Sequence, residues 1–180
     1  MLKLAFFLTA VVCSASSIGY GVNMTVGVGS VVGYIVTDGT IGGLSQSDIT
    51  GWNLLINDGT GTFDLTSLNS QVDLFTPSPS DLAATSTQLF FNFSSGSGFL
   101  LFQSPTTGSG GPAICFEADI TCSNEPAGVQ LYATTLSNQQ FKPLGGDLPI
   151  GTNPEPESVG MLVVGLAALG AGISWKRRHS

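Results

Sequence analysis

Two apolar segments, one at each end of the chain, confine any folded domain to the residues between them. The C-terminal segment, Val159–Trp175, contains no charged residue and is followed by a basic cluster. This cluster comprises Lys176, Arg177 and Arg178. A helix over the segment would be roughly 25 Å long, slightly short of a bilayer core of about 30 Å, and the basic side chains can extend to the headgroups. A buried helix of a globular domain is the alternative, but apolar residues on all sides favour a membrane span. We therefore predict a transmembrane helix over 159–175 and a cytoplasmic basic tail over 176–180.

The N-terminal segment has the three parts of a secretory signal peptide. Lys3 supplies the positive charge, Leu4–Val12 forms the apolar stretch, and small residues follow it. Cys13 raises the alternative of a lipoprotein, but the residue before it is not the small one that a lipid-attachment motif requires. We predict a signal peptide over residues 1–17, removed on export.

A Pro-Glu-Pro triplet precedes the C-terminal apolar segment, at Pro154, Glu155 and Pro156. The triplet, the apolar stretch and the terminal basic cluster together resemble the PEP-CTERM sorting signal of Gram-negative bacteria. The resemblance implies a transient partner, an exosortase. It implies that the tail holds the protein in the inner membrane, with the body in the periplasm, until the chain is cut near the triplet. The body then passes to the cell surface or the extracellular space.

The body of the chain is also similar to the bodies of many PEP-CTERM proteins. The segments that carry this likeness are Thr37–Ser45, Asp48–Asn53, Leu89–Phe93 and Leu100–Gln103. Such bodies mostly have no assigned activity. The likeness therefore implies a family without implying a reaction.

The body is poor in the side chains that perform catalysis. It spans roughly 135 residues, the size of one domain, and its only basic residue is Lys142. The net charge of the whole chain is −7, which disfavours binding to nucleic acid. Because the body has no His, neither Ser-His-Asp nor Cys-His catalysis can be assembled, and the His ligands of zinc and copper sites are missing. We expect a protein that is not an enzyme and that needs no cofactor or metal.

Two cysteines remain after removal of the signal peptide, Cys115 and Cys122. An exported chain enters an oxidising compartment, where a disulfide between them is favoured. The alternative, a metal site with two thiolates and no His, is disfavoured. We predict the disulfide.

The body is typical of an all-β domain, with short β-branched or alternating segments between turn residues. Strands are predicted at 31–37, 52–57, 62–66, 71–75, 83–93, 99–103, 113–117, 129–134 and 139–142. The pattern indicates a single β-sandwich or a flattened barrel over residues 18–143. We expect 83–93 and 99–103 to pair as a hairpin. The Gly- and Pro-rich segment 144–158 is predicted to be a linker to the membrane helix.

Two groups of acidic residues suggest specific chemistry. Glu117 and Asp119 are two positions apart, so an extended strand would present both on one face, as an acid and a base of glycoside hydrolysis. A solvated strand face or a loop beside the disulfide is the simpler interpretation. Asp58 and Asp64 flank a Gly-rich turn that could hold calcium. The spacing lacks the other ligands of an EF-hand, and a hairpin turn with surface acids is the interpretation we favour.

Three aromatic residues raise the alternative of a carbohydrate-binding module. Trp52, Tyr34 and Tyr132 could line a sugar-binding face, although large aromatic residues more often fill the core of a sandwich. The leading hypothesis is an exported surface or matrix protein with a structural or adhesive role. A module that binds polysaccharide is the alternative, and a small glycoside hydrolase is the third hypothesis.

Overall fold

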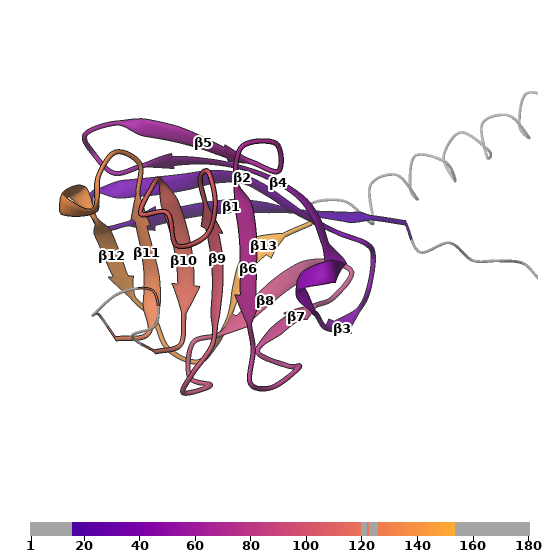
Figure 1. The fold of residues 1–180 in the computed structure, drawn as a ribbon. Coiled ribbons are helices and arrows are strands. Elements are labelled where there is room, and N and C mark those ends of the chain that lie inside the picture. Colours follow the sequence, from indigo (N-terminus) through magenta and orange to yellow (C-terminus); the bar gives the residue numbers. More distant parts are fainter. Residues whose placement is uncertain (1–15, 120–121, 123–125, 154–180) are drawn as a thin grey trace, which may run out of the picture.

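The structure is a computed structural model that describes residues 16–119, 122 and 126–153. These residues form two antiparallel sheets that pack face to face, so the prediction of an all-β domain is confirmed (Figure 1). The eight-stranded sheet has the order β3-β7-β8-β13-β1-β2-β4-β5, and the five-stranded sheet has the order β12-β11-β10-β9-β6. None of the described residues belongs to a helix long and apolar enough to cross a membrane.

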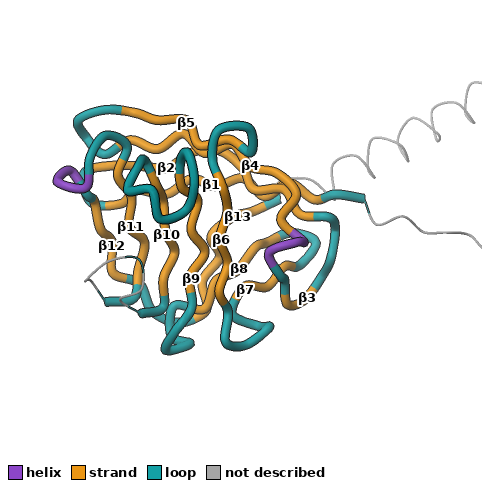
Figure 2. The backbone as a smooth tube through the Cα atoms, viewed as in Figure 1, coloured by secondary structure: helices purple, strands orange, loops and turns teal. Residues whose placement is uncertain are grey.

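The strands follow one another with short connections, shown in Figure 2. Their bounds are β1 (Ile18–Val26), β2 (Gly29–Thr37), β3 (Gly42–Gly43), β4 (Ile49–Asn57), β5 (Thr62–Thr66), β6 (Gln71–Phe75), β7 (Leu82–Ala84), β8 (Gln88–Asn92), β9 (Phe99–Gln103), β10 (Ala113–Glu117), β11 (Gly128–Tyr132), β12 (Gln140–Pro143) and β13 (Asp147–Thr152). Two short 3-10 helices, Gln46–Asp48 and Leu136–Asn138, lie in the connections. The strands predicted at 62–66, 71–75, 99–103 and 113–117 occur with those bounds.

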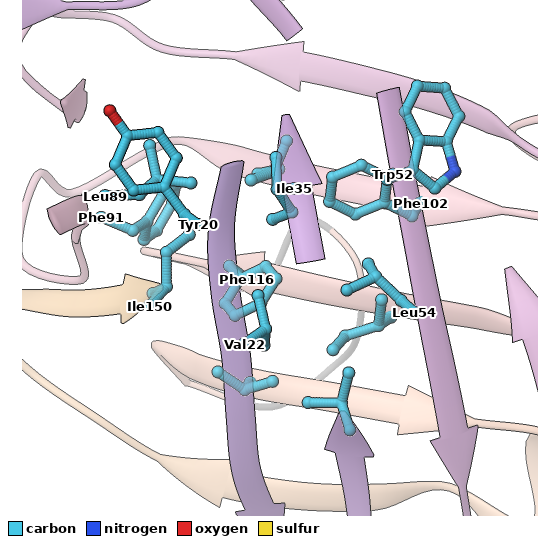
Figure 3. Packing of buried hydrophobic residues seen from close by; sticks show 14 of the residues in the cluster. Tyr20, Val22, Ile35, Trp52, Leu54, Leu89, Phe91, Phe102, Phe116 and Ile150 are labelled. Carbon is cyan, nitrogen blue, oxygen red and sulfur yellow. The ribbon is translucent and has the colours of Figure 1, made fainter. Parts of the chain in front are cut away.

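The core lies between the two sheets and contains aliphatic and aromatic side chains from both (Figure 3). Trp52 of β4 packs against Phe102 of β9, with ring centroids 5.3 Å apart. Phe91 of β8 packs against Phe116 of β10, at 6.5 Å. Because alternate side chains of a strand point to opposite faces, the alternating apolar positions of the sequence supply these inward-facing residues.

The predicted hairpin between residues 83–93 and 99–103 is wrong. β8 pairs with β7 and β13 in the eight-stranded sheet, whereas β9 pairs with β6 and β10 in the five-stranded sheet. The connection crosses from one sheet to the other, and its ends are held by hydrogen bonds from Phe93 N–H to the Gly146 carbonyl and from Ala118 N–H to the Gly98 carbonyl. Alternation showed that both segments are strands, but it carries no information about their partners.

The predicted linker over 144–158 is also wrong in its first part, and the domain extends beyond 143. β13 lies inside that range and forms the connection between β8 and β1 in the eight-stranded sheet. Ile150 is buried in the core. A side chain at Gly151 would come within 2.9 Å of the Tyr20 Cβ, so glycine is required there by close packing and not by flexibility. β1 was likewise not predicted, because Gly19 and Gly21 interrupt its apolar pattern.

β10 and β11 differ from the other strands because every one of their residues is buried. One face of these strands packs on the core, through residues such as Ile114 and Leu131. The other face, turned away from the eight-stranded sheet, must therefore be covered by loops. This covered outer face is where the structure forms a cleft.

Candidate functional site

A cleft of about 540 Å³ lies on the outer face of the five-stranded sheet. We call it the outer cleft. Its residues come from four of the five strands, from the β9–β10 loop and from the start of the second 3-10 helix. The lining includes Asp73, Phe99, Leu101, Gln103, Gln130 and Tyr132. The volume falls in the range of pockets that hold small ligands or parts of larger ones.

Strand register places these side chains in rows that run across the sheet. One row contains Gln130, Cys115, Leu101 and Asp73, each directly opposite the next on a neighbouring strand. The adjacent row contains Tyr132, Ala113 and Gln103. Residues opposite one another on one face of a sheet have neighbouring side chains. The rows therefore form a continuous floor that contains both apolar and polar side chains.

The β9–β10 loop passes in front of the five-stranded sheet in Figure 2, and Gln103 holds it in place. The Gln103 amide nitrogen donates to the Gly111 carbonyl, at 3.2 Å, and to the Tyr132 hydroxyl, at 2.9 Å. Its amide oxygen accepts a hydrogen bond from the Gly108 N–H. Burial raises the pKa of the Tyr132 phenol, and the Gln103 hydrogen bond lowers it by less, so the hydroxyl keeps its proton at neutral pH. Gln103 thus fixes both a wall of the cleft and the Tyr132 side chain.

Gln130 differs from Gln103 because its amide oxygen is not paired. The residue is only 3 % exposed, and within the described part of the chain its Oε1 atom has no hydrogen-bond partner. An unpaired buried acceptor costs about 1–3 kcal/mol. Such a group in the floor of a cleft marks a place where the folded protein lacks a donor that a ligand can supply.

A second hollow, of about 560 Å³, adjoins the outer cleft. The two hollows share Asp73 and Thr107, and the second extends past the edge strand β6 to Gln46, Ser67 and Trp52. We call the two adjoining hollows together the groove.

The disulfide between Cys115 and Cys122 is present, so this prediction is confirmed. It joins residues seven positions apart, and closing such a short loop contributes about 2–3 kcal/mol to stability. The ligand atoms of Cys115, Glu117 and Cys122 lie within 4.8 Å of one another, but the two sulfurs are bonded to each other in this state. Both cysteines line the outer cleft.

The carboxylates suggested for glycoside hydrolysis occupy different environments. Glu117, at the end of β10, is 0 % exposed, and its Oε2 atom accepts a hydrogen bond of 2.8 Å from the Cys122 N–H. Asp119 lies beyond the end of β10 and is partly exposed. The interpretation of a solvated strand face is wrong for Glu117, because its side chain is fully buried. Its carboxylate joins the end of β10 to the backbone of Cys122.

The Gly-rich turn suggested for calcium is held by the hydrogen bonds of the buried Asp58 carboxylate. We call this set of hydrogen bonds the clasp. Asp58 is 1 % exposed, and its Oδ1 atom accepts hydrogen bonds from the Thr60 N–H and hydroxyl and from the Gly61 N–H. Its Oδ2 atom accepts from the Ala133 N–H and from the Thr134 N–H and hydroxyl. Six donors occupy a carboxylate that offers about four lone-pair directions, which leaves no oxygen for a metal ion. The predicted hairpin turn is confirmed, since β4 pairs with β5, but Asp58 is not the surface acid that was expected.

This clasp predicts how stability depends on pH. Burial by itself raises the pKa of the Asp58 carboxyl, but the hydrogen bonds from Thr60, Thr134 and Gly61 outweigh it and hold the pKa well below its usual range. A folded-state pKa below the unfolded value of about 3.9 gives stability that is present above that pH and is lost as the pH falls below it. We expect the free energy of unfolding, measured by urea denaturation between pH 7 and pH 2.5, to decline below about pH 4. The same series in Asp58→Asn should show a shallower decline, and parallel curves would contradict the assignment.

The three aromatic residues suggested for a sugar-binding face do not lie together. Trp52 is 9 % exposed and donates a hydrogen bond of 2.9 Å from Nε1 to the Ser70 hydroxyl, so its interpretation as a core residue is confirmed. Tyr34 is exposed on the outer face of the eight-stranded sheet. Tyr132 alone lines the outer cleft. The three side chains therefore cannot act as one platform.

The residues of the predicted sorting signals lie outside the described residues. This applies to most of the predicted signal peptide, to Pro154, Glu155 and Pro156, to the segment Val159–Trp175, and to the basic cluster of Lys176, Arg177 and Arg178. The structure thus describes the body up to Asn153, and the expectations about export rest on the sequence.

Sequence reasoning missed the principal residues of the outer cleft. Gln103, Gln130 and Asp73 have no motif around them, and only tertiary structure places them on one surface. The one available signal was the polar residue at the centre of an apolar strand, as Gln130 is in β11. No protein-family model matches the chain, and comparisons with curated proteins and with solved structures find no similar protein.

Proposed function

We propose that the chain is an exported protein of the cell envelope or extracellular matrix, with a non-enzymatic structural or adhesive role and a PEP-CTERM type of sorting tail. The observation that carries the proposal is the order of the tail: the triplet Pro154–Pro156, the apolar segment Val159–Trp175 and the basic cluster of Lys176, Arg177 and Arg178. The apolar segment acts as an anchor, and the basic cluster stays on the cytoplasmic side.

The position of the triplet supports this proposal. β13 ends at Thr152, and Pro154 follows two residues later. A cut near the triplet would therefore release a domain in which every described strand is intact. The disulfide Cys115–Cys122 is of the kind that persists outside the cytoplasm. The two-sheet body is in this proposal a single β-sandwich, preceded by the signal peptide of residues 1–17 and followed by the membrane helix.

The charge and burial of the body support a non-enzymatic role. Lys142 is the only basic residue between Ile18 and Asn153, and Glu117, one of the two acidic residues suggested for hydrolysis, is buried. In this proposal the domain acts by binding other molecules after export and not by catalysing a reaction. Its transient partner is an exosortase, and a matrix polysaccharide is its candidate ligand.

Fractionation of cells tests the anchoring step. The full chain should be recovered with the inner membrane or, once cut, at the cell surface, whereas a chain ending at Asn153 should be recovered in the soluble periplasmic fraction. Truncation must not start earlier, because residues 147–152 form β13. Mass spectrometry of the mature C-terminus should place the cut near Pro154–Pro156. Equal membrane retention of the two chains would refute the anchor.

A further inference from the structure

Among the described residues that line the outer cleft, Gln130 has a buried oxygen that the fold leaves without a partner. Gln130 is 3 % exposed on the central part of the five-stranded sheet, and its Oε1 atom accepts no hydrogen bond from the described residues. The neighbouring amide of Gln103 is paired at both its oxygen and its nitrogen. The contrast shows that the fold can satisfy an amide on this face. A hydrogen-bond donor of a ligand beside Gln130 would satisfy this acceptor.

The charges around the cleft restrict the ligand further. None of the described residues that line the outer cleft is Lys, Arg or His, and Asp73 contributes a carboxylate. Phosphate, sulfate or carboxylate groups of a ligand would find no cation here and would be repelled by the acidic body. The Tyr132 hydroxyl is protonated, and it accepts its hydrogen bond from Gln103, which leaves its own hydrogen to donate. The cleft thus offers neutral acceptors and donors, as a hydroxyl-rich molecule requires.

Aromatic and aliphatic surfaces lie beside these polar groups. Phe99 lines the cleft and stacks on Phe75 with ring centroids 6.1 Å apart and an interplanar angle of 29°. Phe75 is 52 % exposed at the edge strand β6, and Leu101 continues the apolar floor. Sugar rings present C–H faces and hydroxyl edges, so a surface with both aromatic and amide groups matches them.

The combined volume of the two hollows suits a chain of several units. The outer cleft and the second hollow share Asp73 and Thr107, and the second hollow is also lined by Trp52 and Gln46. A monosaccharide would fill only part of this space. A polymer could place successive rings in the two hollows.

We propose that the groove formed by the outer cleft and the second hollow binds a neutral polysaccharide, with the Gln130 amide oxygen accepting a hydrogen bond from a sugar hydroxyl. Tyr132 donates to a sugar oxygen, and the Phe99–Phe75 pair contacts the C–H face of a ring. This site differs from the three-aromatic platform that the sequence suggested. The proposal names a ligand for the adhesive role, and it rests on the adhesive role in the proposed function.

The test uses the full-length protein, as purified from expressing cells, in native affinity electrophoresis. The gels contain dextran, laminarin or galactomannan as neutral probes, and alginate or polygalacturonate as acidic probes. We expect retardation by at least one neutral probe and by neither acidic probe, with little change between 50 and 500 mM NaCl. Retardation only by the acidic probes, or by no probe, would overturn the proposal.

Gln130→Met is the decisive variant, since it removes the acceptor and nearly keeps the side-chain volume. We expect affinity for the retarding probe, measured by calorimetry, to fall about tenfold, because one hydrogen bond to the ligand is lost. The melting temperature should stay the same or rise, because an unpaired buried oxygen has been removed. The matched control is Gln88→Met, on the outer face of β8 and away from the groove, which should leave binding unchanged. A lower melting temperature with unchanged affinity in Gln130→Met would show a structural role instead.

Asp73→Asn separates a neutral from a cationic ligand. A neutral polysaccharide should bind this variant within about threefold of the original protein, because the amide still accepts hydrogen bonds. Loss of binding together with a strong dependence on salt would identify a cationic ligand and overturn the proposal. Failure of any of these binding tests leaves the anchoring step open to its own test, because fractionation does not depend on the groove.

Discussion

Replacing Asp58 with asparagine should lower the free energy of unfolding by about 3 kcal/mol. The Asp58 carboxylate accepts six hydrogen bonds, and they join the β4–β5 turn to the end of β11 in the other sheet. An amide has one oxygen, and its NH₂ group would face donors, so several buried N–H and O–H groups would lose their acceptor. Hydrogen bonds to a charged acceptor contribute about 1.5–3 kcal/mol each, and unpaired buried donors cost a similar amount. Urea denaturation at pH 7 measures the difference.

The chain contains a matched control for this substitution. Asp38 begins the same Asp-Gly-Thr sequence as Asp58, and it also accepts a hydrogen bond of 2.9 Å from the N–H two residues on, that of Thr40. Asp38 is exposed, and its carboxylate accepts no hydrogen bond from the described residues of the opposite sheet, so Asp38→Asn should cost less than about 0.5 kcal/mol. Equal losses from the two substitutions would show that the local turn matters and that the clasp between the sheets does not.

Ending the chain before β13 should prevent the domain from folding, whereas ending it at Asn153 should not. β13 is the strand that joins β8 to β1, so its removal divides the eight-stranded sheet into β3-β7-β8 and β1-β2-β4-β5. Two inner edges would then lose their hydrogen bonds and become open to aggregation. We expect a chain ending at Gly146 to lack cooperative thermal unfolding. A chain ending at Asn153 should melt cooperatively, at the temperature of the full chain's body.

A point substitution in β13 tests the importance of this strand without shortening the chain. Ile150 is 3 % exposed and lies in the core, so Ile150→Ala should cost about 3 kcal/mol. Leu148→Ala, at a partly buried position of the same strand, should cost less. If the chain ending at Gly146 unfolded cooperatively at the same temperature as the chain ending at Asn153, residues 147–152 would be dispensable, as a linker is.

The strands that the sequence predicted are those with regular alternation. Thr62–Thr66, Phe99–Gln103 and Ala113–Glu117 have apolar residues at intervals of two or a continuous apolar run, bounded by turn residues. Local sequence sufficed there because an inward-facing side chain must be apolar in any sheet. The two strands with glycine at intervals, Ile18–Val26 and Asp147–Thr152, were missed. Glycine in them accommodates close packing, as at Gly151 beside Tyr20, which composition cannot distinguish from flexibility.

The candidate site was less predictable than the fold. The cysteine count predicted the disulfide, because only two cysteines remain outside the predicted signal peptide. Gln130, Gln103 and Asp73 come from three different strands, and nothing near them in the sequence links them. They meet only because β6, β9, β10 and β11 are paired in one sheet and in one register.

The sequence by itself determined that the body is all β, that it is acidic and nearly free of basic residues, and that its two cysteines pair. These properties follow from composition and from local periodicity, which do not depend on the residues that are neighbours in space. Tertiary structure alone decided which strands are partners, that Asp58 is a buried clasp, and that Gln130 is an unpaired acceptor in a groove. Those properties depend on strand register and on which loops cover which face, and both are set by contacts between residues far apart in the chain.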